Sequence, residues 1–124
     1  MKKIILIILI TFCICACNSS QNKVTNKPTN DVISKEQMEK LMEDDSYVIV
    51  DVRTESEFEE SHIVGAINIP YIQIDENVDL DKNKNIFVYC YSGGRSALAA
   101  VMLKDLGYTV FDLGAFSQID LPKE

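Results

Sequence analysis

Cysteine is scarce in the part of the sequence that can fold. Four cysteines occur among the 124 residues, and Cys13, Cys15 and Cys17 all lie close to the N-terminus. The remainder of the chain contains only Cys90. One cysteine can form neither an internal disulfide framework nor a cysteine-based zinc site, so both are excluded from this part of the chain. We expect neither a metal nor a cofactor.

Basic residues are also few. The sequence has 12 Lys and Arg against 19 Asp and Glu, which gives a formal net charge of -7. It therefore lacks the basic footprint of a nucleic-acid-binding protein, and we expect no nucleic-acid partner. The acidic residues are spread along the chain, as on an ordinary solvated surface. No segment repeats, and the length suits one domain with a modest core, which we expect to be a monomer.

The longest apolar run lies at the N-terminus. It covers residues 4–16 and follows a short basic start, Met-Lys-Lys. The run is shorter than the roughly 20 residues that a transmembrane helix needs, but it suits the core of a signal peptide. Its end, Ile14-Cys15-Ala16-Cys17, resembles the bacterial lipobox. The resemblance implies that Cys17 is lipid-modified and becomes the first residue of the mature protein.

A lipid on Cys17 would make the membrane a partner of this protein and would place it at the cell envelope, outside the cytoplasm. A plain cleaved signal peptide and an uncleaved anchor are the alternatives. Residues 18–30 are mostly polar, with Val24 as an isolated apolar residue, so they cannot bury a core. We therefore expect a signal peptide over 1–16, a lipid-anchored flexible tether over 17–31, a folded domain over 32–120 and a tail over 121–124.

Strand and helix patterns alternate through the predicted domain. Residues 47–52, Tyr-Val-Ile-Val-Asp-Val, are apolar almost throughout, as in a parallel strand covered on both faces. The alternation predicts an α/β fold, a small parallel sheet with helices on both faces, whose ligands bind at the carboxyl ends of the strands. The other predicted strands are 31–33, 67–69, 86–89 and 108–111. One predicted helix begins after Ser34, and two more cover 54–60 and 96–106. Residues 112–116 are predicted to form a loop.

Cys90 lies where one of these strands ends. It is followed by residues 91–95, Tyr-Ser-Gly-Gly-Arg, and then by the predicted helix. Backbone N–H groups in a tight glycine loop converge on one point, and a helix N-terminus adds positive potential there. Both favour the thiolate form of a cysteine and hold an anion beside it. Cys90 is therefore the candidate catalytic residue, and the alternative is a structural cysteine that ends a core strand.

Several short motifs follow one another along the predicted domain. They are Asp51-Val52-Arg53, Glu57-Phe58, His62-Ile63, Gly65-Ala66, Asn68-Ile69-Pro70 and the run from Tyr89 to Ser96. In this order they resemble the signature regions of the rhodanese-like sulfurtransferase family. The resemblance spans residues 32–119 and implies a single rhodanese-like domain. It implies that Cys90 accepts a sulfane sulfur as a persulfide and passes it to a thiophilic acceptor, a thiol or cyanide.

The resemblance also implies that the substrate-binding residues surround Cys90. The N–H groups of residues 91–96 would stabilise the terminal sulfur and the anionic group of the donor. Gly93 and Gly94 would permit the backbone angles of the loop. Arg95 would supply its charge either to the donor anion or to a structural carboxylate, and Arg53 would lie at the pocket rim or in a salt bridge with a neighbour such as Glu57. The predicted substrate-binding residues are Tyr91, Ser92, Gly93, Gly94, Arg95, Ser96 and Arg53.

Departures from the family pattern bear on the pocket and on the donor. The family's tryptophan near the last glycine turn is absent, and Ile119 stands at about its place, so the far wall of the pocket differs. Tyr91 and Ser92 replace the basic residues of some thiosulfate-using relatives, which weakens thiosulfate as the donor and leaves organic persulfides and polysulfide open. The single histidine, His62, is expected to pack a turn rather than to act as a base.

Sulfur transfer from thiosulfate, an organic persulfide or polysulfide to a thiol or cyanide is the function we expect. One alternative is a module that holds or senses a persulfide without turnover. Another is a phosphatase or an arsenate reductase, because some of these enzymes share the architecture. Four residues separate Cys90 from Arg95, one fewer than in phosphatases of that type. The loop therefore favours sulfur over phosphate.

Overall fold

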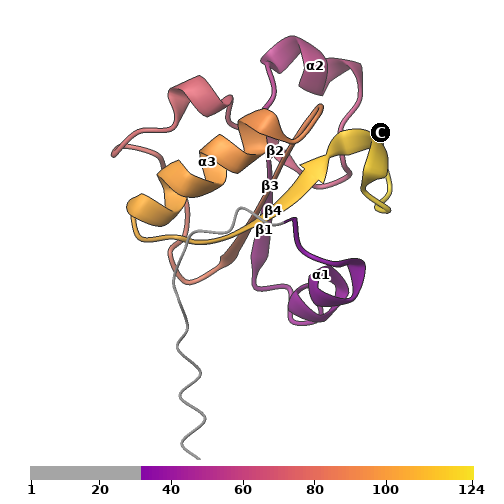
Figure 1. Ribbon diagram of the computed structural model, residues 1–124, viewed down its shortest axis with the longest axis horizontal. Coiled ribbons are helices and arrows are strands. Elements are labelled where there is room, and N and C mark those ends of the chain that lie inside the picture. The colour runs from indigo at the N-terminus through magenta and orange to yellow at the C-terminus, as the bar shows by residue number, and fades with distance from the viewer. Residues whose placement is uncertain (1–31) are drawn as a thin grey trace, which may run out of the picture.

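The computed structural model describes residues 32–124 (Figure 1). The predicted signal peptide, the lipobox with Cys17 and the predicted tether lie outside the described residues. A central sheet carries α1 (Lys35–Leu41) on one side and α3 (Gly94–Asp105) on the other. The short helix α2 (Glu55–Glu60) lies beyond one end of the sheet. Helices therefore cover both faces, which confirms the predicted architecture.

Four parallel strands form the sheet in the order β2-β1-β3-β4. Within residues 32–124 the chain also forms two short 3-10 helices, η1 and η2, after β2 and β4. The alternation of strands and helices confirms the predicted α/β fold class. The remaining elements are β1 (Tyr47–Asp51), β2 (Ile67–Asn68), η1 (Tyr71–Gln73), β3 (Asn85–Cys90), β4 (Thr109–Ala115) and η2 (Phe116–Gln118).

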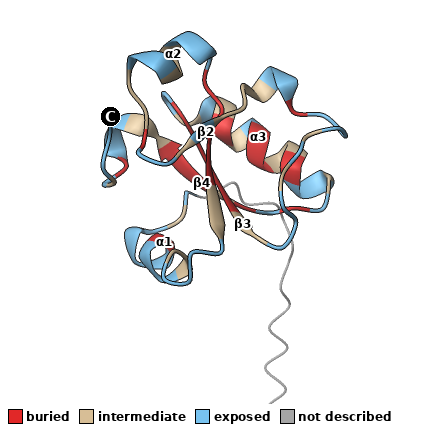
Figure 2. Cartoon of the chain, turned by 180° about the vertical axis from the view of Figure 1, so that it is seen from behind, coloured by how far each residue is buried: buried red, intermediate tan, exposed pale blue. Residues whose placement is uncertain are grey.

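The central strand β3 is buried on both faces (Figure 2). Successive side chains of a strand point to opposite faces, so β3 contributes alternately to two cores. Ile86, Val88 and Cys90 pack in the core beneath α3, whereas Phe87 and Tyr89 pack in the core on the α1 side. Cys90 is therefore the last core position of its strand as well as the first residue of the following loop.

Capping boxes fix where the first two helices begin. The Ser34 side chain accepts the N–H of Gln37, whose side chain in turn accepts the N–H of Ser34. Thr54 and Glu57 make the same reciprocal pair at the start of α2. Each box satisfies N–H groups that a helix leaves without an internal partner, so both short helices start at a defined residue. The predicted cap at Ser34 is confirmed.

Two predictions about β4 and its neighbour are wrong. Val32 and Ile33 form no strand, although the Ile33 N–H donates one hydrogen bond to the Asp112 carbonyl at 3.1 Å. Residues 112–115 continue β4 instead of forming a loop. Gly114, the residue that suggested a loop, has a φ of 79° at a bulge where the register with β3 shifts. A left-handed glycine lets the strand absorb an extra residue and continue.

The tail over residues 121–124 returns to the domain. Lys123 forms an antiparallel bridge with Ile63, in the turn before β2. The N–H of Val64 donates to the Pro122 carbonyl at 2.9 Å, and two further backbone bonds join this turn to Glu124 at 2.8 and 2.9 Å. The tail is thus hydrogen-bonded to the fold. Over residues 32–124, no helix combines the length and the apolar composition required to cross a membrane.

Candidate active site

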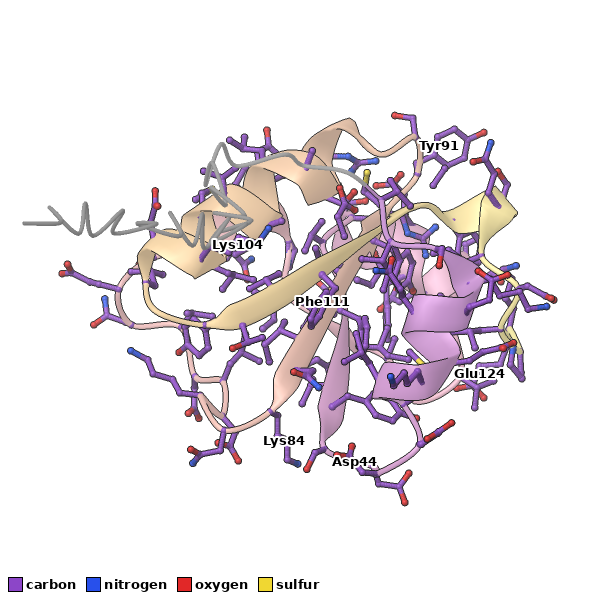
Figure 3. The ribbon with its side chains drawn as sticks, turned by 60° about the horizontal axis from the view of Figure 1, so that its bottom comes forward. Asp44, Lys84, Tyr91, Lys104, Phe111 and Glu124 are labelled. Atoms are coloured by element: carbon purple, nitrogen blue, oxygen red, sulfur yellow. The ribbon has the colours of Figure 1, made fainter. Side chains whose placement is uncertain are left out.

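The cysteine loop, residues 90–96, lies at the carboxyl edge of the sheet. Cys90 is the last residue of β3, and Arg53 follows the parallel neighbour β1 by two residues. Tyr91 lies at the opposite end of the sheet from Lys84, which directly precedes β3 (Figure 3). The topology therefore places Arg53 and the cysteine loop at the same edge, where parallel α/β sheets bind their ligands.

Cys90 lies at the base of the cysteine loop. Its side chain is fully buried, and Sγ accepts a hydrogen bond from the Gly93 N–H at 3.0 Å. Gly93 reaches this position with a φ of 97°, a left-handed conformation that glycine adopts without a steric penalty. It is also the N-cap of α3, so the loop that holds the sulfur opens directly into a helix N-terminus, with its positive potential.

The last residues of the cysteine loop, Gly94 to Ser96, also form the first turn of α3. Gly94 is the first residue of α3, two residues before the predicted start, and has no positive φ. The prediction that both glycines supply unusual backbone angles is therefore wrong for Gly94. The Ser96 hydroxyl is buried and donates to the Gly93 carbonyl at 3.1 Å. Ser96 thus closes the first turn of the helix beneath the loop.

Arg95 is held by a carboxylate of α2. Its two terminal nitrogens donate to the two oxygens of Glu57 at 2.7 and 2.9 Å. These hydrogen bonds are the main cause that lowers the pKa of Glu57 to about 2. Of the two partners that the sequence left open, the structure thus gives Arg95 a carboxylate. The pair ties the cysteine loop to α2. The charge of Arg95 therefore lies in the loop but is neutralised by Glu57.

Arg53 is buried against the carboxylate that precedes it by two residues. Its Nε lies 3.0 Å from both oxygens of Asp51, and Nη2 lies 2.6 Å from Asp51 Oδ2 and 2.6 Å from the Ser61 carbonyl. The side chain of Arg53 is only 4% exposed. The salt bridge is therefore with Asp51 rather than with Glu57. A buried ion pair whose partners are also hydrogen-bonded holds its geometry tightly.

A cavity of about 210 Å³ borders the cysteine loop. Cys90 does not line it, but Tyr91, the next residue, does. Cavities of about 160 Å³ and 270 Å³ elsewhere in the described residues include no residue of the cysteine loop. The first cavity therefore adjoins the candidate site. It is lined by Arg53, Glu57, Glu60, Ser61, Tyr91 and Phe116.

Comparisons with known proteins agree with this geometry. Residues 34–119, most of the described chain, match the model of the rhodanese-like domain family. The chain belongs to the rhodanese-like domain family. It is 37% identical over 78 residues to thiosulfate sulfurtransferase PspE of Escherichia coli, covering 60% of this chain and 75% of PspE. A solved rhodanese with anions from E. coli shares 34% identity at a TM-score of 0.58, covering 63% of this chain and 96% of that one.

A further relative is thiosulfate sulfurtransferase GlpE of Coxiella burnetii, 37% identical over 62 residues. The match covers 49% of this chain but only 58% of GlpE. Relatives of this kind support sulfur transfer as the activity of the family.

The rhodanese-like domain uses its single histidine to pack a turn. The ring of His62 stacks on Phe58 at a centroid distance of 3.8 Å, and Nδ1 lies 2.8 Å from the Phe58 carbonyl. Nε2 lies 3.2 Å from a carboxylate oxygen of Glu124. These contacts fit the packing role that the sequence predicted for His62. Within residues 32–124, no group of three or more His, Cys, Asp and Glu side chains is placed to hold a metal ion.

The predicted site residues did not include Glu60, Ser61 and Phe116, which line the cavity. Phe116 forms the wall on the η2 side, whereas Ile119, at about the place of the family's tryptophan, is buried beneath α1 with Met38. The buried Tyr89 hydroxyl accepts the Ile63 N–H at 3.1 Å, and burial raises the pKa of Tyr89. An aromatic residue directly after the glycine turn was the available signal for Phe116. Its place at the cavity depends on how η2 folds back, which local sequence does not encode.

Proposed function

We propose that this rhodanese-like domain is a sulfurtransferase that moves a sulfane sulfur through a persulfide on Cys90. The observation that carries the proposal is the Gly93 N–H at 3.0 Å from Cys90 Sγ, in a loop that opens into the N-terminus of α3. Donors aimed at the sulfur stabilise the thiolate before transfer and the anionic persulfide after it. The similarity to thiosulfate sulfurtransferases supports the same reaction class.

The reaction has two half-reactions. In the first, the Cys90 thiolate attacks the sulfane sulfur of thiosulfate, an organic persulfide or polysulfide, and a bond forms between Sγ and that sulfur. The bond from that sulfur to the rest of the donor breaks, and the leaving group keeps its electron pair, as sulfite from thiosulfate, a thiolate from an organic persulfide or a shorter polysulfide from polysulfide. In the second, a thiol or cyanide attacks the outer sulfur, and Cys90 leaves as a thiolate. No outside oxidant is required.

Access to Sγ matters for the first half-reaction. Because the Cys90 side chain is fully buried, a donor cannot reach Sγ while the loop stays as described. A small displacement of the cysteine loop or of the side chains around it must open the sulfur toward the cavity that Tyr91 lines. Such motions of loops on a rigid scaffold are common in enzymes that exclude water.

Turnover separates this proposal from a module that only holds a persulfide. We expect repeated transfer from an organic persulfide or thiosulfate to cyanide, followed as thiocyanate, with many products formed per protein. Cys90→Ser should abolish the transfer while the far-ultraviolet circular dichroism spectrum stays unchanged. One sulfur taken up per protein without further product would favour the holding or sensing module. Turnover that survives in Cys90→Ser would contradict the role of Cys90.

We also propose that the protein is a lipoprotein anchored through Cys17 at the cell envelope, outside the cytoplasm. The support is the sequence Ile14-Cys15-Ala16-Cys17 at the end of an apolar run, in a part of the chain outside the described residues. Expression of the full chain in a bacterium with labelled palmitate should give a labelled membrane-bound protein. Cys17→Ser should remove the label and release the protein from membranes. A mature chain that starts elsewhere and carries no lipid would contradict the anchor.

A further inference from the structure

The cavity beside the cysteine loop has two aromatic walls. Tyr91 comes from the loop itself and is 67% exposed, while Phe116 comes from η2 at the carboxyl end of β4. Phe116 is held by Arg53, whose Cζ lies 4.3 Å from the ring centre, and it stacks on Tyr89 at 5.7 Å. The cavity measures about 210 Å³, and an apolar cavity of about 150 Å³ holds a benzene molecule. The space therefore suits an organic group.

The charges around this cavity leave a negative balance. Both nearby arginines are paired with carboxylates, Arg53 with Asp51 and Arg95 with Glu57. Glu60 also lines the cavity, is exposed, and forms no ion pair among residues 32–124. Among the residues that line the cavity, one arginine thus stands beside two glutamates, Glu57 and Glu60. A ligand that enters the cavity therefore meets the unpaired carboxylate of Glu60. Each arginine near the cavity is already paired with a carboxylate.

One more cation lies nearby but outside the cavity. Lys123 Nζ lies 5.1 Å from the centre of the Phe116 ring and donates to the Ile119 carbonyl at 2.8 Å, and Lys123 does not line the cavity. The acidic balance at the cavity wall therefore remains. Like charges that approach each other in a partly desolvated cleft repel more strongly than in bulk water, so each negative charge on a donor weakens its binding.

We propose that the preferred donor is an organic sulfane-sulfur compound with an apolar or aromatic group and at most one negative charge. Its organic group lies between Tyr91 and Phe116, and its sulfane sulfur enters the cysteine loop. Aromatic walls favour aromatic groups beyond the area that they bury. The inorganic dianion thiosulfate has no organic group for these walls and carries one more negative charge. This inference rests on the proposed sulfur transfer and narrows its substrate class.

Thiosulfonates provide donors that separate the two effects. The Cys90 thiolate attacks the terminal sulfur of R–SO2–S⁻, the bond between that sulfur and the sulfonyl sulfur breaks, and the sulfinate R–SO2⁻ leaves with the electron pair. The reactants and the products each carry two negative charges in total, and no oxidant is consumed. Benzenethiosulfonate and methanethiosulfonate share the reacting group and the charge and differ only in R. Thiosulfate transfers a sulfane sulfur too but is a dianion.

The test measures the rate of persulfide formation on Cys90 in the full chain with each of the three donors. Each rate is divided by the rate of the same donor with a free thiol, which removes differences in intrinsic reactivity. We expect benzenethiosulfonate to exceed methanethiosulfonate by about tenfold, which corresponds to about 1.4 kcal/mol. Methanethiosulfonate should in turn exceed thiosulfate, and added salt should narrow only that second gap, because salt screens charge and not apolar contact.

Variants test which side chains cause the preference for an aromatic group and which cause the preference for a lower charge. Tyr91→Leu, at an exposed position, and Phe116→Leu should each lower the ratio of benzenethiosulfonate to methanethiosulfonate toward one. Glu60→Gln should raise the thiosulfate rate and leave that ratio unchanged. Glu59 is an exposed neighbour of Glu60 that does not line the cavity. Glu59→Gln should therefore change neither the thiosulfate rate nor the ratio of benzenethiosulfonate to methanethiosulfonate, and it serves as the matched control.

The outcomes distinguish this inference from the proposed function. Persulfide formation that is as fast with thiosulfate as with methanethiosulfonate, after normalisation, would overturn the charge preference. A donor ratio that neither Tyr91→Leu nor Phe116→Leu changes would overturn the aromatic site. In both cases a persulfide on Cys90 would still support sulfur transfer. No persulfide with any donor would contradict sulfur transfer itself and this inference with it.

Discussion

At the scale of single residues, adjacent glycines perform different tasks around Cys90. Gly93 has a φ of 97°, and its N–H donates to the sulfur, whereas Gly94 has an ordinary helical backbone as the first residue of α3. A Cβ at Gly93 would meet nothing closer than 3.9 Å, and a Cβ at Gly94 would meet nothing within 4 Å. The two positions therefore differ in backbone conformation and not in available space, which makes them a matched pair.

Gly93→Ala should lower the free energy of unfolding by about 1–2 kcal/mol, because a left-handed φ is strained for alanine. Relief of that strain would move the N–H away from Cys90 Sγ and slow persulfide formation. Gly94→Ala should instead raise the free energy of unfolding by about 0.5–1 kcal/mol, because alanine loses less backbone entropy in a helix. Urea denaturation of both variants measures the difference. Equal effects at the two positions would contradict the described loop.

At the scale of elements, one ion pair joins α2 to the first turn of α3. The bidentate contact between Glu57 and Arg95 joins two helices, of which α2 lines the cavity beside the cysteine loop through Glu57 and Glu60. Glu57 also caps its own helix through Thr54. The carboxylate of Glu57 therefore caps the start of α2 and also holds Arg95, in the first turn of α3. Loss of its charge should loosen both elements together.

Acid should expose this coupling. The pKa of Glu57 falls from an ordinary 4.5 to about 2 in the folded protein, mainly through its hydrogen bonds with Arg95. A depressed folded-state pKa contributes stability that is fully present above pH 4.5 and is lost as the pH falls toward 2. Because the pair is partly exposed, screening reduces the contribution to about 1 kcal/mol.

Glu57→Gln should therefore lower the free energy of unfolding near pH 7 and flatten its decline between pH 4.5 and 2. Glu59→Gln is the matched control, because Glu59 is exposed on the same helix and forms no salt bridge among the described residues. Chemical denaturation at a series of pH values gives both curves. If the free energy of unfolding declined equally between pH 4.5 and 2 in Glu57→Gln and in the protein without substitutions, the depressed pKa of Glu57 would be ruled out.

At the scale of the whole molecule, the tail closes the fold around the turn before β2. Residues 121–124 make backbone hydrogen bonds to His62 and Val64 and a bridge to Ile63. Lys123 also lies against Phe116, a wall of the cavity. The chain end thus supports both the turn that follows α2 and one side of the candidate active site.

Removal of residues 121–124 should lower the free energy of unfolding by about 2 kcal/mol, since three backbone hydrogen bonds are lost at roughly 0.5–1.5 kcal/mol each. Glu124→Gln keeps the backbone bonds and should change stability by less than about 0.5 kcal/mol, as expected for a partly exposed side-chain contact with His62. Hydrogen exchange at the Val64 amide should accelerate in the truncated chain alone. Unchanged exchange there would contradict the docking of the tail.

Much of this fold could be predicted because the patterns that encode it are local. An apolar run such as 47–52 indicates a buried strand, and alternation with helices implies parallel pairing, so the shared edge of Cys90 and Arg53 follows from topology. The partner of Arg95 could not be predicted, because Glu57 reaches it only through the way α2 sits against the sheet. The tail gave no signal either, since its bonds are to backbone groups far away in the sequence.

The most direct measurement of the central claim is mass spectrometry of the peptide covering residues 85–95, which trypsin releases after Lys84 and Arg95. The full chain is incubated with a persulfide or thiosulfonate donor, without acceptor, and the products are trapped with iodoacetamide. We predict one added sulfur atom on Cys90, removed again by a thiol acceptor and absent in Cys90→Ser. A folded protein whose Cys90 gains no sulfur from any donor would contradict the claim.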